Sequence, residues 1–282
     1  MNKLTMLDYV KETPGVLRTN IEQYTTLVDP LMKEVQQKEI KRILLVASGS
    51  SHNACYCARS FVEKVSGLEV RIITPYTFTY YENDIKENDL VLVVTQSGLS
   101  TNAIEALKII KKKECKAICL TGNKNSDVKD VADVVIEYGV GEELVGYVTK
   151  GVSSLALFLD LFAIAYSGKT EYLDELKKAV DLNEEMIDQA TNFIQRHYKN
   201  FTSMSWVYSC GAGANYGTAL ESALKMGETI HIPSCCYEIE EYIHGPNLQL
   251  TPQYNVIFFD GNDSASRRVE QVYKATRKVS NR

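Results

Sequence analysis

The sequence predicts an α/β protein built from two parallel-sheet units in tandem. Three observations support this fold class. Short apolar runs alternate with stretches of helical periodicity, the order of strand, glycine turn and helix recurs in the second half, and a charged helical segment lies between the two halves. Strands separated by helices are typical of a parallel sheet that is covered on both faces. At 282 residues, 45% of them hydrophobic, the chain is long enough to form two cores.

The first unit is expected over residues 41–168, after an N-terminal helical segment at 1–40. Five short apolar runs are its strand candidates, and helical patterns lie between them. The strand candidates are 42–48, 68–74, 90–95, 116–121 and 133–138, and the helical patterns lie near 51–66, 101–113 and 150–167. The most apolar window, 151–168, contains Asp160 and is short for a membrane span, so it predicts a buried helix.

The second unit is predicted from a weak internal repeat. The run 205–232 repeats the order of strand, glycine turn, helix and strand. The spacing that takes Gly49 to Gly211 also places 230–232 as the counterpart of 68–70. The identities are few, so the repeat rests on the pattern of elements more than on shared residues.

Residues 169–200 connect the two predicted units. They are charged, carry apolar residues at helical spacing and lack Gly and Pro, which predicts a bridging pair of helices rather than a flexible linker. The second unit then occupies 201–282. At the same repeat spacing, the counterparts of strand 133–138 and helix 150–167 fall beyond Arg282. We therefore expect the second unit to be C-terminally incomplete, by about 45–50 residues.

Composition argues against several classes of function. The net charge is −5 without a basic stripe, so nucleic acid is not expected as a partner. The N-terminus has no apolar signal core, and together with the short apolar window this predicts a cytoplasmic protein without a membrane partner. The seven cysteines are odd in number, and their spacings match no common zinc pattern. We expect reduced thiols, no metal site and no cofactor.

Small hydroxyl residues gather at two strand-to-helix transitions of the first unit. The segment "SGSSHN" (48–53) follows the first strand and "TQSGLST" (95–101) follows the third. In an open parallel sheet, ligands bind beyond the carboxyl ends of the strands, where helix N-termini favour an anion. Ser and Thr also cap helices generally, so plain capping is the alternative. The P-loop lysine and the G-x-G-x-x-G pattern are absent, which favours a phosphate other than that of a nucleotide.

A charged helix marks the second unit. In "ALESALKMGE", Glu221, Lys225 and Glu228 stand at positions i, i+4 and i+7 of one helix face. Such spacing is often a solvated salt-bridge face. The helix follows a core strand, however, so part of its surface should be buried. His244 stands before Gly-Pro, and a single histidine is more often structural than catalytic, although it can titrate near neutral pH.

These segments resemble the SIS (sugar isomerase) family. "GSSHN" and "TQSGLST" look like its phosphosugar-binding loops, and "ALESALKMGETIHIPSCCYEIEEYIHGP" (219–246) is similar to the isomerase domain of glucosamine-6-phosphate synthase. The resemblance covers about 40 to 282 and extends to fructosamine 6-phosphate deglycases. It implies two tandem SIS domains, each a flavodoxin-like three-layer αβα sandwich with a parallel sheet.

The resemblance also implies the roles of individual binding residues. The loops would hold a sugar phosphate, with some members facing the phosphate and others the sugar. Backbone near Gly146, in "GYVTKG", would touch the sugar, and Glu241 would orient the site. The phosphate ligands would be Ser51, Thr95, Gln96, Ser97 and Ser100, and the residues toward the sugar Ser48 and Ser50. Leu99 departs from the family, which usually has Glu at that position.

For catalysis, the resemblance implies that Glu228 shuttles a proton between C1 and C2, His244 opens the sugar ring and Lys225 lies beside them. A carboxylate and an imidazole suit such proton transfer. The expected substrate is a sugar 6-phosphate or a sugar-amine 6-phosphate, and the reaction isomerisation, deamination or deglycation without glutaminase activity. A homodimer is also implied. The alternative is a non-catalytic phosphosugar sensor, and the two differ in whether bound sugar phosphate is turned over.

Overall fold

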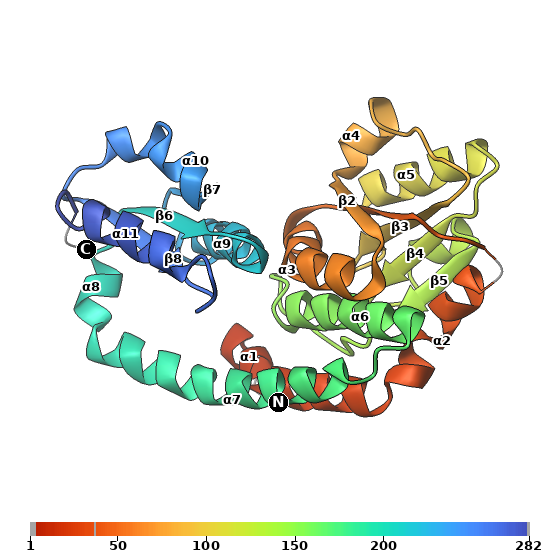
Figure 1. Ribbon diagram of the computed structural model, residues 1–282, viewed down its shortest axis with the longest axis horizontal. Coiled ribbons are helices and arrows are strands. Elements are labelled where there is room, and N and C mark those ends of the chain that lie inside the picture. Colours follow the sequence, from red (N-terminus) through yellow and green to blue (C-terminus); the bar gives the residue numbers. More distant parts are fainter. Residues whose placement is uncertain (1–3, 37, 281–282) are drawn as a thin grey trace. The chain divides into compact units, whose positions relative to one another are not determined.

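The computed structural model describes residues 4–36 and 38–280 (Figure 1). The chain divides into two compact units, Met1–Glu185 and Met186–Arg282. Each unit contains its own parallel sheet, so the predicted α/β class with parallel sheets is confirmed.

The first unit is built on a five-stranded parallel sheet. Its strand order is β2-β1-β3-β4-β5, and every pair of neighbours is parallel. The five strand candidates of the sequence are all strands of this sheet. They are β1 (Arg42–Ala47), β2 (Glu69–Ile73), β3 (Asp89–Thr95), β4 (Ile118–Thr121) and β5 (Val134–Glu137).

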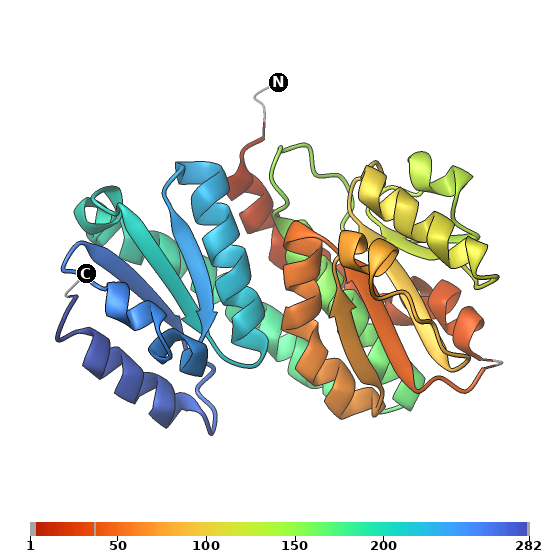
Figure 2. The same ribbon diagram turned by 90° about the horizontal axis from the view of Figure 1, so that it is seen from above.

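Helices cover both faces of this sheet and make it a three-layer sandwich (Figures 1 and 2). Alternate residues of β1 point to opposite faces: Leu45 packs in the cluster with α3 and α6, and Leu44 packs in the cluster with α4 and α5. The helices α1 and α2 join the first of these clusters. The helices are α1 (Met6–Glu22), α2 (Tyr24–Val35), α3 (Gly49–Ser66), α4 (Pro75–Tyr80), α5 (Thr101–Lys112), the 3₁₀ turn η1 (Asp127–Asp130) and α6 (Lys150–Ser167).

Helix α6 is the apolar helix that the sequence predicted to be buried. By length and composition alone it could cross a membrane, but 61% of it is buried inside the structure. Leu155, Phe158 and Phe162 are fully buried, and α6 makes its main contacts with α3. Such burial is what the core helix of a soluble domain shows.

The second unit contains a three-stranded parallel sheet in the order β7-β6-β8. This order repeats that of β2-β1-β3 in the first sheet. The predicted bridging pair is instead one long helix, α7, which crosses the boundary between the units, followed by the five-residue α8. The elements are α7 (Tyr172–Arg196), α8 (Tyr198–Thr202), β6 (Trp206–Gly211), α9 (Ala214–Lys225), η2 (Met226–Ile230), β7 (Ser234–Glu238), α10 (Ile239–Ile243), η3 (Pro246–Gln249), β8 (Tyr254–Phe259) and α11 (Ser266–Thr276).

The predicted spacing of the repeat is wrong. Strand β1 begins at Arg42 and β6 at Trp206, whereas the predicted spacing would match Arg42 with Met204. The turn between β6 and α9 is also longer than the turn between β1 and α3, so the sequence offset between the two copies increases after it. Residues 230–232 therefore do not begin a strand. They lie at the end of a π-helical turn, where His231 adopts a left-handed conformation with φ 56°.

Candidate functional site

A cavity of about 820 Å³ opens at the carboxyl ends of β1 and β3 in the first unit. Its wall is formed by the loops that lead into α3 and α5 and by the segment that precedes α6. This is where a parallel sheet of this kind is expected to hold a ligand. All eight residues that the sequence assigned to binding in the first unit line it: Ser48, Ser50, Ser51, Thr95, Gln96, Ser97, Ser100 and Gly146.

The first loop turns sharply into α3. Gly49 starts the helix with φ 56°, a conformation that favours glycine. The side chain of the N-cap residue Ser48 does not cap the helix; its Oγ accepts a hydrogen bond of 3.2 Å from Asn102 Nδ2 instead. Ser50 and Ser51, in the first turn, are buried. The first turn of α3 thus reaches the cavity without a side-chain cap from Ser48.

The second loop has a similar design. Ser100 is the N-cap of α5, and its hydroxyl accepts from Thr95 Oγ1 at 3.2 Å rather than capping the helix. Ser97 Oγ accepts from the backbone N–H of Leu99. Gly98 has φ 67°, and a Cβ there would lie 1.7 Å from Ser126 Oγ, so the loop path requires glycine. Two helix N-termini therefore meet one cavity, which is an arrangement that favours an anion.

The charges on the cavity wall are all negative. Among the described residues, those that line it include no lysine or arginine, while Glu137, Glu142 and Glu143 belong to it. Glu137 forms an ion pair of 3.5 Å with Lys124. Hydroxyl groups, side-chain amides and helix N-termini are therefore the donors that this wall offers to an anion.

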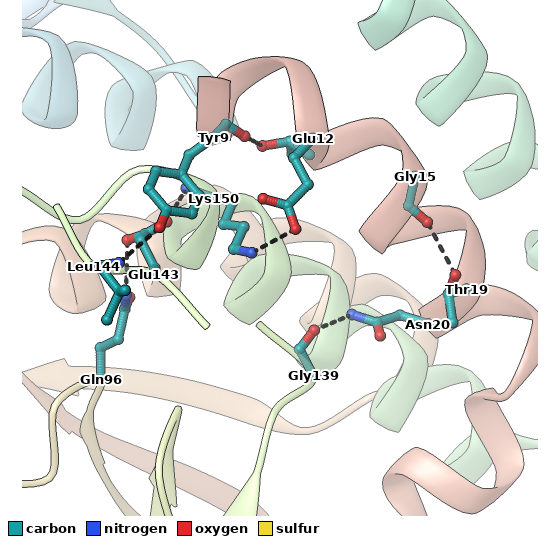
Figure 3. A network of polar contacts seen from close by, with 11 residues as sticks. Tyr9, Glu12, Gly15, Thr19, Asn20, Gln96, Gly139, Glu143, Leu144 and Lys150 are labelled. Carbon is teal, nitrogen blue, oxygen red and sulfur yellow. Dashed lines mark hydrogen bonds and ion pairs between the residues drawn. The ribbon is translucent and has the colours of Figure 1, made fainter. Parts of the chain in front are cut away.

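Glu143 is the residue of this wall that sequence reasoning missed. Its carboxylate accepts from Gln96 Nε2 at 2.8 Å and from the backbone N–H of Lys150 at 2.7 Å (Figure 3). It also accepts from the backbone N–H of Thr149 at 2.9 Å. It thereby places a negative charge at the N-terminus of α6, where the helix dipole stabilises it. The other end of the Gln96 amide, Oε1, accepts from Tyr138 OH at 3.0 Å. Glu143 lies too far before α6 to belong to a known capping motif, so the sequence does not predict this contact.

The second unit places three charged residues together. Lys225 Nζ lies 3.1 Å from Glu221 Oε1 and 2.6 Å from Glu228 Oε2. The side chains of Lys225 and Glu221 are 16% and 15% exposed, and that of Glu228 is 34% exposed. The cluster is therefore partly buried rather than a fully solvated face. Glu228 lies in the π-helical turn η2, and such turns occur frequently at functional sites.

His244 and Glu241 lie on a different element, the short helix α10 and its C-cap. The backbone N–H of His244 donates to the Glu241 carbonyl at 3.1 Å. The carboxylate of Glu238 caps this helix by accepting from the N–H groups of Glu240 and Glu241. The structure thus joins Lys225 to Glu228, and it carries His244 and Glu241 on a separate capped helix.

The cysteines show no sign of a metal or redox site in the part of the chain that the structure describes. All seven cysteines are thiols, and among residues 4–36 and 38–280 no group of three or more His, Cys, Asp and Glu residues is placed to hold a metal ion. Burial raises the pKa of the Cys119 and Cys210 thiols to about 12. Such thiols are protonated and unreactive at neutral pH.

Comparison with known proteins assigns a family to the first unit. Residues 38–165 match the family model of the SIS domain. The first unit contains a SIS domain. The three-layer sandwich, the two serine-rich loops and the cavity between them all belong to this domain. The matched residues lie within the first unit, so a second SIS domain remains a prediction.

The chain is also homologous to a family of larger enzymes. It is 28% identical over 237 residues to glutamine–fructose-6-phosphate aminotransferase (isomerizing) from Thermotoga maritima, an alignment that covers 80% of this chain and 39% of that protein. The same enzyme from Clostridium perfringens is 26% identical over 255 residues, with 86% and 42% covered. The chain spans about two fifths of the length of these curated relatives.

Solved structures share the fold over nearly the whole chain. A protein from Clostridium difficile 630, provisionally described as a phosphosugar isomerase, is 26% identical with a TM-score of 0.87, covering 99% of this chain and 81% of that one. The C-terminal domain of glucosamine-fructose-6-phosphate aminotransferase from Francisella tularensis has a TM-score of 0.84 at 21% identity, with 99% and 82% covered. Glucosamine-6-phosphate deaminase from Thermotoga maritima has 0.83 at 20%, with 98% and 82% covered. The last two likenesses concern the fold alone.

Proposed function

We propose that this protein is an enzyme that binds a sugar 6-phosphate in the cavity of its SIS domain and moves a proton between C1 and C2 of the sugar. The observation that carries the proposal is the convergence of two helix N-termini, with their serine-rich loops, on one cavity. A phosphate needs many donors at once, and the two loops supply hydroxyl and backbone N–H groups together. The homologous aminotransferases are named for fructose 6-phosphate, which is a ligand of this class.

The binding residues keep the roles given above. Ser51, Thr95, Gln96, Ser97 and Ser100 would hold the phosphate. The remaining wall, with Ser48, Ser50 and the backbone at Gly146, would face the sugar. Because these donors are neutral, hydrogen-bond geometry rather than net charge would select the ligand.

The acid–base groups that we propose for the reaction lie in the second unit. Glu228 is the proton acceptor and donor, and Lys225, at 2.6 Å from it, is the cation that would stabilise the developing enolate oxygen. His244 would open the ring and Glu241 would orient the site. The reaction would be isomerisation of a sugar phosphate, or deamination or deglycation of an amino-sugar or sugar-amine 6-phosphate, carried out by a cytoplasmic homodimer.

The binding half of the proposal is tested by titration calorimetry with fructose 6-phosphate and glucosamine 6-phosphate. The double variant Ser97→Ala/Ser100→Ala should weaken binding by about 2–4 kcal/mol, or about 1–2 kcal/mol for each lost charge-assisted hydrogen bond. Ser66→Ala is the matched control, because Ser66 lies at the opposite end of α3 and its hydroxyl donates to the Val62 carbonyl. Equal affinity of the double variant and the wild type would show that these loop hydroxyls do not bind the phosphate and serve only helix capping.

Turnover decides between an enzyme and a sensor. The same sugar phosphates are incubated with the protein in D₂O, and deuterium at C1 and C2 is followed by NMR. An enzyme of the proposed kind incorporates deuterium, because its base exchanges with solvent between the two transfers. Tight binding without exchange or product for any sugar phosphate would contradict the enzyme and support a phosphosugar sensor.

A further inference from the structure

The N-terminal helix α1 holds the segment that forms one wall of the cavity. The backbone N–H of Leu144, a cavity-lining residue, donates to Tyr9 OH of α1 at 3.0 Å (Figure 3). Lys150, at the start of α6, is 2% exposed, and its Nζ lies 3.0 Å from Glu12 Oε1 and 5.1 Å from the centre of the Tyr9 ring. Two residues of α1 thus contact the two ends of segment 144–150.

A second cavity, of about 480 Å³, is lined by residues of α1, by residues 139–142, which come shortly before that segment, and by Lys150. Its wall includes Tyr9, Glu12 and Lys150, and it shares Val140, Gly141 and Glu142 with the wall of the larger cavity. The segment 140–142 therefore separates two hollows. Val140 is buried in the hydrophobic core, whereas Gly141 and Glu142 are exposed, so the polar contacts that follow them at Leu144 and Lys150 help to fix their position.

Glu143 transmits this position to the binding loop. It lies between the shared wall and Leu144, and its carboxylate ties Gln96 to the first N–H groups of α6. Gln96 also packs against Gly151, where a Cβ would lie 1.7 Å from Gln96 Oε1. Both polar ends of the Gln96 amide are thus engaged by the protein, through Glu143 and Tyr138, before any ligand arrives.

We propose that Glu143 is a positioning residue for sugar-phosphate binding, and that Tyr9 of α1 braces it. The inference rests on the proposed function of the cavity, because it assigns the residues that hold its wall in place. Glu143 acts through Gln96 and through the N-terminus of α6. Its carboxylate satisfies three donors at once, and a neutral amide in its place cannot accept all three bonds with comparable strength. Loss of the charge therefore loosens the wall on both sides of the cavity.

The first experiment measures binding of fructose 6-phosphate and glucosamine 6-phosphate to Glu143→Gln and Tyr9→Phe. Glu143→Gln should weaken the affinity about 10- to 100-fold, and Tyr9→Phe, which removes one neutral hydrogen bond, about three- to tenfold. In turnover, the loss should appear in KM, with kcat within a few-fold. Tyr166→Phe is the matched control, since Tyr166 lies near the far end of α6 and its hydroxyl bonds the Ile40 carbonyl at 3.5 Å. It should bind as the wild type does.

The second experiment needs no sugar phosphate. Hydrogen exchange of the free protein should be faster in Glu143→Gln at residues 144–151 and 96–100, while exchange in β1 and β3 stays as in the wild type. Exchange that rises throughout the first unit, or affinity and exchange that both stay unchanged, would overturn the positioning role. If the wild type binds no sugar phosphate but hydrogen exchange at 144–151 and 96–100 is faster in Glu143→Gln, the proposed function is wrong. The role of Glu143 in positioning the cavity wall is then still supported.

Discussion

Two similar substitutions in the cluster around Lys225 can distinguish a catalytic role of its carboxylates from a structural one. Glu221 and Glu228 both contact Lys225 Nζ, at 3.1 and 2.6 Å. Glu221→Gln and Glu228→Gln each remove one negative charge and keep the size of the side chain. If Glu228 transfers the proton, only its substitution should stop the reaction.

The magnitudes follow from the burial of the three side chains. Each carboxylate pairs with Lys225 in a partly buried site, so each variant should lose about 1–2 kcal/mol of the free energy of unfolding. Glu228→Gln should in addition lower kcat by about 10²–10⁴ while its affinity for sugar phosphate stays within a few-fold. Glu221→Gln should keep kcat within about tenfold, because its lost contact perturbs only the position of Lys225.

The assay combines urea unfolding with turnover of fructose 6-phosphate and glucosamine 6-phosphate, and with deuterium exchange at C1 and C2. Unfolding shows that both variants fold, and exchange isolates the proton transfer from later steps. Wild-type exchange that survives in Glu228→Gln would remove Glu228 from the mechanism. Equal losses of kcat in the two variants would show that the charge of the cluster matters and that Glu228 has no separate chemical role.

Three further predictions concern the first unit. Asp89→Asn should lower the free energy of unfolding by about 3 kcal/mol. The guanidinium of Arg42, which the Asp89 carboxylate accepts from at 2.7 and 2.9 Å, loses its charge partner in this variant. A free energy of unfolding in urea within about 0.5 kcal/mol of the wild type would contradict this. Burial raises the pKa of Asp160 well above its usual value. The wild type should therefore lose stability relative to Asp160→Asn as the pH rises above about 4, by at most about 1.4 kcal/mol per pH unit. Parallel profiles of the free energy of unfolding against pH for the two proteins would refute this prediction. Gly98→Ala should cost about 2–4 kcal/mol of stability and most of the affinity for sugar phosphate, because a Cβ at this positive φ would collide with Ser126 Oγ. A wild-type affinity of this variant in calorimetry would show that the loop can shift.

Much of the first unit could be predicted because its signals are local. Each buried strand is a short apolar run with a turn at its end, and all five lie within a few residues of their predicted bounds. Seven of the eight cavity residues were predictable for a related reason, whereas Gly146, in the segment before α6, was assigned only through the family resemblance. Parallel strands end at the same edge of the sheet, so loops that follow β1 and β3, adjacent strands in the sheet, must lie side by side.

Other features depend on contacts that no local pattern encodes. Glu143 meets Gln96 across 47 residues of sequence, and it caps α6 from outside the usual capping positions. The repeat spacing was misjudged because matching Gly49 with Gly211 equates residues with different roles: Gly49 starts a helix, and Gly211 ends a strand. The π-helical turn at Met226–Ile230 could not be read from a helical period either, since that period assumes regular α-helix throughout.

The absence of lysine and arginine among the described residues of the cavity wall has a consequence for how a ligand would reach it. Sites built on cations draw phosphates from a distance, and their association slows as added salt screens the field. Here Glu137 is paired with Lys124, while Glu142 and Glu143 oppose a dianion at long range, so the attraction begins only when hydroxyl and amide groups are in contact with it. Added salt should therefore leave the affinity unchanged or improve it, and encounter would depend on concentration alone.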